Sequence, residues 1–170
     1  MVIILMGVEG SGKTTVGQLL AQKLHWQFAD ADNFHPPANT EKIHRGIPLG
    51  DSDRAPWLSA LRAAIDNWNA DRENVILACS ALKTKYRQEL SAGSVQFVYL
   101  KGSYELILSR LRARRGHFAS DSILASQFAD LEEPQDAISV TVDKSPEAIV
   151  SEIIAKLNLA PLAYPDPTNL

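Results

Sequence analysis

The sequence has a single cysteine, no long apolar run and almost no excess of charge. Cys79 is the one cysteine among 170 residues, so no intramolecular disulfide can form and a reducing, cytoplasmic location is expected. No apolar run approaches the length of a membrane span. The formal net charge of −3 gives no electrostatic reason to expect nucleic acid or an anionic membrane as a partner.

What remains is the composition of a folded α/β protein. The chain is 45% hydrophobic and 22% charged, and its length suits one domain over residues 1–170. Apolar stretches alternate with helical patterns, which predicts a doubly wound domain with five parallel strands and helices on both faces. Strands are expected at 2–6, 26–29, 75–79, 95–100 and 138–142, and helices at 13–24, 38–45, 54–71, before Leu90, at 104–115 and from Pro146.

The first strand runs directly into a glycine-rich motif, which makes it a core strand rather than a signal peptide. Residues 7–14, Gly-Val-Glu-Gly-Ser-Gly-Lys-Thr, match the pattern G-x-x-x-x-G-K-[ST] between a strand and a helix. Such a loop points backbone N–H groups and a helix N-terminus at a polyphosphate. We therefore predict a nucleoside triphosphate site that includes Mg²⁺, at Gly7, Gly10, Ser11, Gly12, Lys13, Thr14 and Thr15.

Two aspartates follow the second strand. Asp30 and Asp32 are expected at the carboxyl edge of the sheet, beside the phosphate loop. Asp32 is the candidate to accept a proton from the substrate hydroxyl, and Asp30 to support Mg²⁺ through water together with the Thr14 hydroxyl. A motile or regulatory NTPase usually has an acidic residue at the end of a second apolar strand. The strand that ends at Ala78 has no such acid, and this absence favours a small-molecule kinase.

The motifs together resemble those of the gluconokinases, small P-loop kinases related to shikimate and adenylate kinases. The resemblance extends to about residue 157; Ala31 stands where glycine is common and Glu9 where serine is common. It implies a P-loop kinase fold with a mobile lid, a homodimer, and transfer of the ATP γ-phosphate to the 6-hydroxyl of D-gluconate. Its blocks are residues 7–14, Asp30 to Asp32 with His35, Pro36, Asn39 and Lys42, residues 46–58, Cys79 to Lys83 with Tyr86 and Arg87, and Arg110 to Glu132.

A gluconate pocket needs a cation for the carboxylate and hydrogen-bonding groups for the hydroxyls. Arg54 offers a planar fork that suits a carboxylate. Lys83 and Arg87 lie one turn apart on an expected helix and are predicted to face the same site. With Asp32 and His35, these residues complete the predicted substrate-binding set.

Two arginines are assigned to the nucleotide and the lid. Arg110 and Arg114 share a helix face through their spacing of four, and Arg114 is predicted to stabilise the charge of the transferring phosphoryl group. Arg110 is placed near the adenine or the phosphates. The lid is expected over about 114–134, with a helix around 123–129, and a surface tail over about 160–170. Lys13, Asp32 and Arg114 form the predicted catalytic set.

Two other functions stay open at this point. One is a kinase of the same fold that acts on shikimate or another sugar acid. The other is a nucleotide-binding regulatory module, although Asp32 and a lid arginine favour catalysis.

Overall fold

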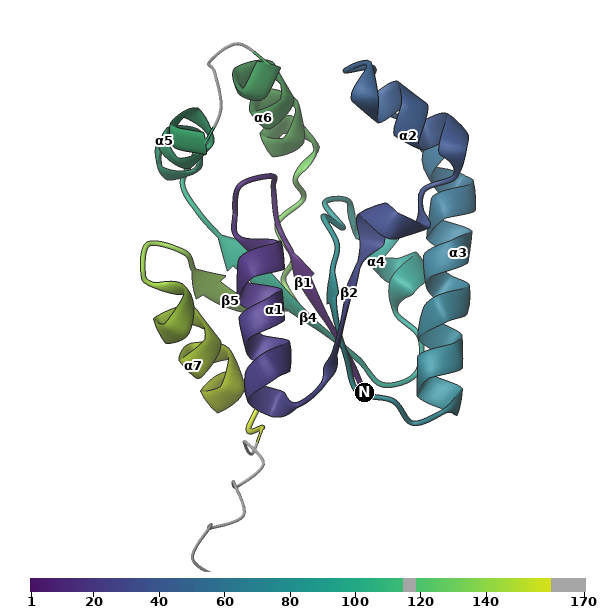
Figure 1. The fold of residues 1–170 in the computed structure, drawn as a ribbon, viewed down its shortest axis with the longest axis vertical. Coiled ribbons are helices and arrows are strands. Elements are labelled where there is room, and N and C mark those ends of the chain that lie inside the picture. The colour runs from purple at the N-terminus through teal and green to yellow at the C-terminus, as the bar shows by residue number, and fades with distance from the viewer. Residues whose placement is uncertain (115–118, 160–170) are drawn as a thin grey trace, which may run out of the picture.

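The computed structural model describes residues 1–114 and 119–159, and the side chains of all of these except 114, 119 and 120. Five parallel strands in these residues form one sheet in the order β2-β3-β1-β4-β5 (Figure 1). The predicted single α/β domain with a five-stranded parallel sheet is confirmed. The predicted tail, and residues 115–118 of the predicted lid, lie outside the described residues.

The central strand brings the chemically important loops to one edge. Leu5 of β1 is level with Ala78 of β3, which is in turn level with Asp30 of β2. Beyond this level, the Gly7 N–H donates to the Ser80 carbonyl at 3.2 Å. The phosphate loop therefore lies at the end of β1 opposite to the N-terminus (Figure 1). The strands are β1 (Val2–Met6), β2 (Gln27–Asp30), β3 (Val75–Ala78), β4 (Val95–Lys101) and β5 (Ile138–Thr141).

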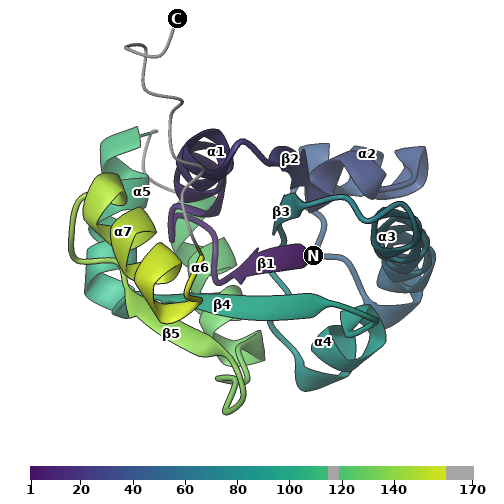
Figure 2. The ribbon, with the colours of Figure 1, turned by 90° about the horizontal axis from the view of Figure 1, so that it is seen from below.

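Helices cover both faces of the sheet. Seen from below, α1, α5 and α7 lie on one side of the sheet and α3 and α4 on the other (Figure 2). In residues 1–114 and 119–159, no helix combines the length and apolar character that a membrane span requires. The helices are α1 (Lys13–Leu24), α2 (Pro37–His44), α3 (Asp51–Ala70), α4 (Thr84–Leu90), α5 (Tyr104–Arg114), α6 (Ala119–Asp130) and α7 (Pro146–Lys156), with a 3-10 turn η1 (Ala31–Phe34).

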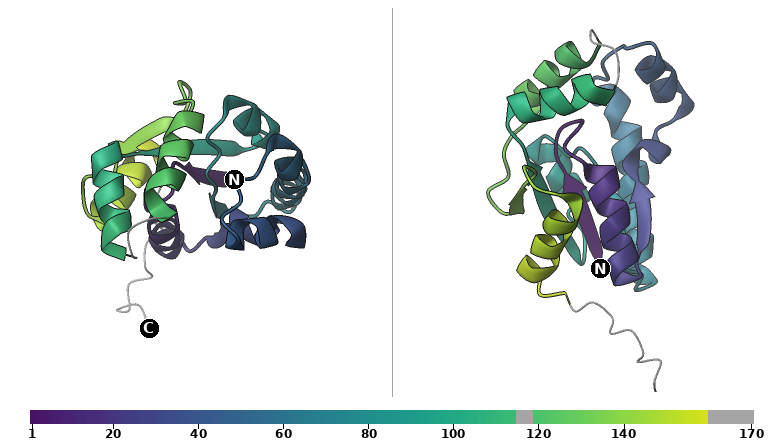
Figure 3. Two further views of the ribbon diagram at one scale, coloured as in Figure 1. Left: turned by 90° about the horizontal axis from the view of Figure 1, so that it is seen from above. Right: turned by 60° about the vertical axis from the view of Figure 1, so that its left-hand side comes forward.

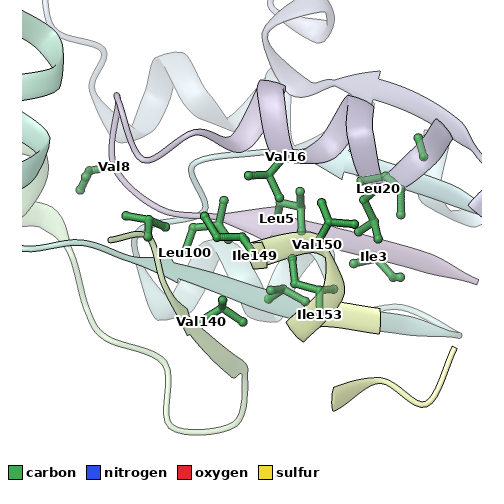
Figure 4. Close-up of a cluster of buried hydrophobic side chains, with 14 of the residues drawn as sticks. Ile3, Leu5, Val8, Val16, Leu20, Leu100, Val140, Ile149, Val150 and Ile153 are labelled. Carbon is green, nitrogen blue, oxygen red and sulfur yellow. The ribbon is translucent and has the colours of Figure 1, made fainter. Parts of the chain in front are cut away.

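Two hydrophobic cores meet at β1, whose residues are all fully buried. Ile3 and Leu5 point into the core under α1 and α7 (Figure 4). Val2, Ile4 and Met6 point into the core under α3 and α4. A parallel strand that is buried on both faces explains why this segment is apolar throughout rather than alternating.

Two helices differ in extent from the prediction. Helix α3 begins at Asp51 rather than near residue 54, because the Asp53 carboxylate accepts from the Gly50 N–H at 3.0 Å and Arg54 N–H donates to the Gly50 carbonyl at 3.1 Å. These bonds satisfy backbone groups at the helix start. Helix α6 spans twelve residues and so exceeds the predicted 123–129 at its N-terminal end.

Ile4 tests the contribution of the central strand to stability. Ile4→Ala should lower the free energy of unfolding by about 2–5 kcal/mol, because Ile4 has no exposed surface and its loss leaves a cavity. Ile43→Ala is the control, since Ile43 is 47% exposed and its truncation should cost far less. Urea titration of both variants measures the difference, and equal losses would contradict this account of the core.

Candidate active site

The phosphate loop takes a conformation that only glycine adopts easily. Gly10 has a φ of +80°, and a Cβ there would lie 2.9 Å from Leu111 Cδ2. Gly12 has a φ of +96° and immediately precedes α1. The loop thus curls in front of the α1 N-terminus, where unpaired N–H groups favour an anion.

Polar side chains in the loop have few internal partners. The Ser11 hydroxyl is buried and has no hydrogen-bond partner among the residues that the structure describes. The Lys13 ammonium donates to the carbonyls of Gly7 and Val8, both at 3.0 Å, and burial lowers its pKa. Anionic oxygens bound in the loop would accept from both side chains. The loop is therefore suited to phosphate.

A cavity of about 350 Å³ adjoins the loop and is of the size that holds a nucleoside. Arg110 lines it, and its guanidinium donates to the Val142 carbonyl. The side chain of Arg114 lies outside the described residues. Sequence reasoning missed the contribution of the α7 N-terminus, because that segment carries no nucleotide motif. The lining residues are Gly10, Ser11, Gly12, Thr15, Val16, Arg110, Ala113, Lys144, Pro146 and Ile149.

The two aspartates lie beside the loop, as their position after β2 predicts. Asp30 accepts from the Asp32 N–H at 3.0 Å with one carboxylate oxygen and from the Thr14 hydroxyl at 3.4 Å with the other. Loss of hydration in the cleft, and next the charge of Asp30, raise the pKa of Asp32. A carboxylate with a raised pKa is better matched to taking up a proton.

His35 is held in one orientation by its neighbours. Its ring stacks on Trp57 with centroids 4.7 Å apart, and the Trp57 N–H donates to the Ala31 carbonyl at 2.7 Å. The Asn39 amide nitrogen donates to the Asp53 carbonyl at 2.7 Å and lies 3.3 Å from His35 Nδ1. Because that nitrogen can only donate, Nδ1 accepts and the proton of the neutral ring is on Nε2. Partial burial also lowers the pKa of His35.

A second, smaller pocket is also lined by Trp57, and we call it the acceptor pocket. Arg54 and Lys83 both line it, as the sequence predicts for a carboxylate site. Arg54 donates to the Tyr86 hydroxyl at 3.1 Å, and this hydroxyl donates to Asp51 at 2.5 Å. Sequence reasoning missed Tyr86 as a pocket residue, although it lies in a block that resembles the gluconokinases. The full lining is Arg54, Trp57, Ser80, Leu82, Lys83, Tyr86 and Asp130.

The position of Arg87 differs from the prediction that Arg87 and Lys83 face the same site. It does not line the acceptor pocket, and it is only 7% exposed. Its guanidinium donates to the carbonyls of Ala81 and Leu82 at 3.0 and 2.9 Å. Since Ala81 has a left-handed φ of +43°, these bonds stabilise a strained turn. Arg87 holds the loop that carries Lys83, and we leave it out of the substrate contacts.

Helix α6 touches both halves of the site. Gln127 accepts from the Glu9 N–H in the phosphate loop at 2.6 Å, and Asp130 pairs with Lys83 at 3.4 Å. Figure 3 shows α5 and α6 on one side of the carboxyl edge and α2 on the other.

The fold and the phosphate loop together define a small P-loop kinase. Residues 9–158 match the family model described as shikimate kinase. The probable gluconokinase of Xenopus tropicalis is 44% identical, over 90% of this chain and 91% of that protein. The thermoresistant gluconokinase of Escherichia coli (strain K12) is 42% identical, again over 90% and 91%.

A solved structure agrees with these sequence matches. The crystal structure of a gluconokinase from Sinorhizobium meliloti 1021 has a TM-score of 0.82 and is 40% identical, over 92% of this chain and 90% of that one. The chain belongs to the gluconokinase family, within the P-loop kinases. The resemblance found in the motifs is thereby confirmed.

Gly10 tests the shape of the phosphate loop. Gly10→Ala should weaken ATP binding about tenfold or more, which is ~1.4 kcal/mol, because the added methyl group displaces the loop from Leu111. Gly46→Ala is the matched control, since Gly46 also has a positive φ of +68° but no atom within 4 Å of an added Cβ. Calorimetry with a non-hydrolysable ATP analogue measures both. Equal effects of the two substitutions would argue against a steric role of Gly10.

Proposed function

We propose that the protein is a gluconokinase that transfers the γ-phosphate of ATP to the 6-hydroxyl of D-gluconate and releases 6-phospho-D-gluconate and ADP. One observation carries this proposal. Arg54 and Lys83 form a cationic pocket for an acid next to an aspartate pair that adjoins the phosphate loop. The gluconokinases among its relatives, at 42–44% identity over most of the chain, support the choice of acid.

ATP would bind with its phosphates in the loop and its adenosine in the adjoining cavity. Ser11 would contact phosphate oxygens, because its buried hydroxyl has no partner among the described residues, and Lys13 would contact them because its ammonium lies at the carbonyls of the same loop. Arg110 lines the cavity and would contact the nucleotide. The proposed Mg²⁺ would be held by the Thr14 hydroxyl and, through water, by Asp30. The Thr14 hydroxyl oxygen and a carboxylate oxygen of Asp30 lie 3.4 Å apart. When bound, Mg²⁺ neutralises charge on the β- and γ-phosphates.

Asp32 would prepare the acceptor hydroxyl for attack. It lies two residues beyond Asp30, on the turn that the Asp30 carboxylate caps. Its raised pKa helps it to take the hydroxyl proton as the new P–O bond forms. His35, with its proton on Nε2, would donate to a hydroxyl of the acceptor.

The arrangement of charges supports the 6-hydroxyl as the position of phosphorylation. Arg54 and Lys83 lie in the pocket with Trp57, and the Trp57 indole bonds to Ala31, the residue before Asp32. A sugar acid whose carboxylate contacts the two cations would extend past Trp57 toward Asp32. The hydroxyl that reaches Asp32 is then at the end opposite to the carboxylate, which in gluconate is the 6-hydroxyl.

The lid, the oligomer and the compartment are also part of the proposal. Residues 114–134 would act as a lid, because Gln127 of α6 already contacts the phosphate loop. Arg114 would supply positive charge to the transferring phosphoryl group on closure. Family resemblance favours a homodimer, and the single buried Cys79 suits the cytoplasm.

An acceptor panel tests this function. ADP release should be fast with gluconate and slow with shikimate, AMP, glucitol and no acceptor, because only gluconate pairs a carboxylate with a distant primary hydroxyl. Glucitol is the matched control, since it has the same carbon chain without the carboxylate. Equal rates of ADP release with and without each acceptor would contradict the kinase activity. Activity on shikimate alone would contradict the choice of gluconate as the acceptor.

Asp32 tests the chemical step. Asp32→Ala should lower kcat about a hundredfold or more and leave ATP binding intact, because general-base contributions are of this size. Asp66→Ala is the control, since Asp66 lies on the surface of α3 and pairs with Arg62. Near-normal turnover of Asp32→Ala would remove Asp32 from the mechanism.

The pH profile gives a second reading of the same residue. Asp32 acts as the carboxylate, and its pKa is raised, so kcat/KM should fall as the pH drops through a value above the ~3.9 of a free aspartate. An acid limb at or below the free value would contradict the assignment.

A further inference from the structure

The two cations of the acceptor pocket are held by carboxylates in different ways. Arg54 reaches Asp51 only through the Tyr86 hydroxyl. Asp51 also pairs with Lys85 at 2.5 Å, and the bonds from Lys85 and Tyr86 lower its pKa to about 2. The negative charge of Asp51 is therefore neutralised mainly by Lys85. Since Arg54 makes no direct ion pair with Asp51, its positive charge remains available to an acceptor.

Lys83 has a direct acidic partner in the same pocket. Its ammonium lies 3.4 Å from a carboxylate oxygen of Asp130, at the end of α6, and both residues line the pocket. Their side chains are 25% and 35% exposed, so the pair is partly shielded from water. An acceptor carboxylate that binds Lys83 has to compete with Asp130.

The pocket is too small in this state for a six-carbon acid. Its cavity measures about 20 Å³, which is close to the space that one water molecule needs. Asp130 forms part of its wall, so movement of Asp130 away from Lys83 would both free the ammonium and enlarge the pocket.

We infer that Asp130 is an internal substitute for the acceptor carboxylate. It neutralises Lys83 and closes the pocket when no acceptor is bound. The acceptor carboxylate then takes its place on Lys83, and the end of α6 is released. This assigns Asp130 as a residue that tunes acceptor affinity and couples acceptor binding to α6, and it rests on the proposed function.

Glu132 provides a matched control on the same segment. Its N–H donates to the Leu82 carbonyl at 2.9 Å, and its carboxylate accepts from the Thr84 N–H at 2.7 Å. Glu132 thus anchors the segment after α6 to the loop that carries Lys83, but it does not line the acceptor pocket. Glu132→Gln and Asp130→Asn remove the same charge, but only Asp130 forms an ion pair with Lys83, whereas Glu132 acts on Lys83 from a longer distance.

The experiment measures KM for gluconate at saturating ATP. Asp130→Asn should lower this KM roughly two- to fivefold, the range expected for a partly exposed ion pair, and leave the KM for ATP unchanged. Asp130→Glu should return the gluconate KM toward the wild-type value, and Glu132→Gln should lower the KM less than Asp130→Asn does, because Glu132 makes no direct ion pair with Lys83. An unchanged or higher KM in Asp130→Asn, or an equal fall in Glu132→Gln, would overturn the inference.

A double-mutant cycle separates this effect from a change in the helix. In a Lys83→Met background, Asp130→Asn should no longer change gluconate binding measured by calorimetry, because the residue it releases is absent. A persisting effect would also overturn the inference. Wild-type protein without turnover of gluconate would refute the proposed function, which is a different result from either outcome for Asp130.

Discussion

The parallel pairing of β1 between β3 and β4 is the constraint on which the rest of the structure depends. The register of this pairing aligns the carboxyl ends of β1, β2 and β3. The phosphate loop, Asp30 and the loop after β3 therefore lie at the same edge of the sheet. Parallel strands need crossover connections, whose helices here pack on both faces of the sheet; α3 carries Arg54 of the acceptor pocket, and Lys83 lies in the loop between β3 and α4. The strand register thus determines where the loops of the site lie, and the side chains on those loops determine what the site can bind.

Charge alternates across the site in the order that phosphoryl transfer needs. Lys13 and the α1 N-terminus provide positive potential for the phosphates, and the pair Asp30 and Asp32 follows with negative charge. Beyond Trp57, Arg54 and Lys83 again provide positive charge. In the proposed mechanism, each anionic group of the two substrates has a cationic site, and Asp32, the proposed proton acceptor, belongs to the negative pair.

Local signals in the sequence predict the phosphate loop and the aspartate pair, because backbone conformation and strand order determine where they lie. Long-range packing decides the remainder. The spacing of Lys83 and Arg87 cannot reveal that the Arg87 guanidinium turns back to two carbonyls of the preceding loop. Similarly, Tyr86 and Asp130 enter the acceptor pocket from elements whose mutual placement only the folded core determines.

Under the proposed function, the donor loop and the acceptor cations lie at opposite ends of one bound sugar acid. The most direct measurement is phosphorus–carbon coupling in the product made from ATP and ¹³C-labelled gluconate, observed by NMR. We expect ³¹P coupling to C6 and C5, with phosphate on the hydroxyl farthest from the carboxylate. Coupling that places the phosphate on any other hydroxyl, or an acyl phosphate at C1, would contradict the proposed orientation, in which Arg54 and Lys83 bind the carboxylate.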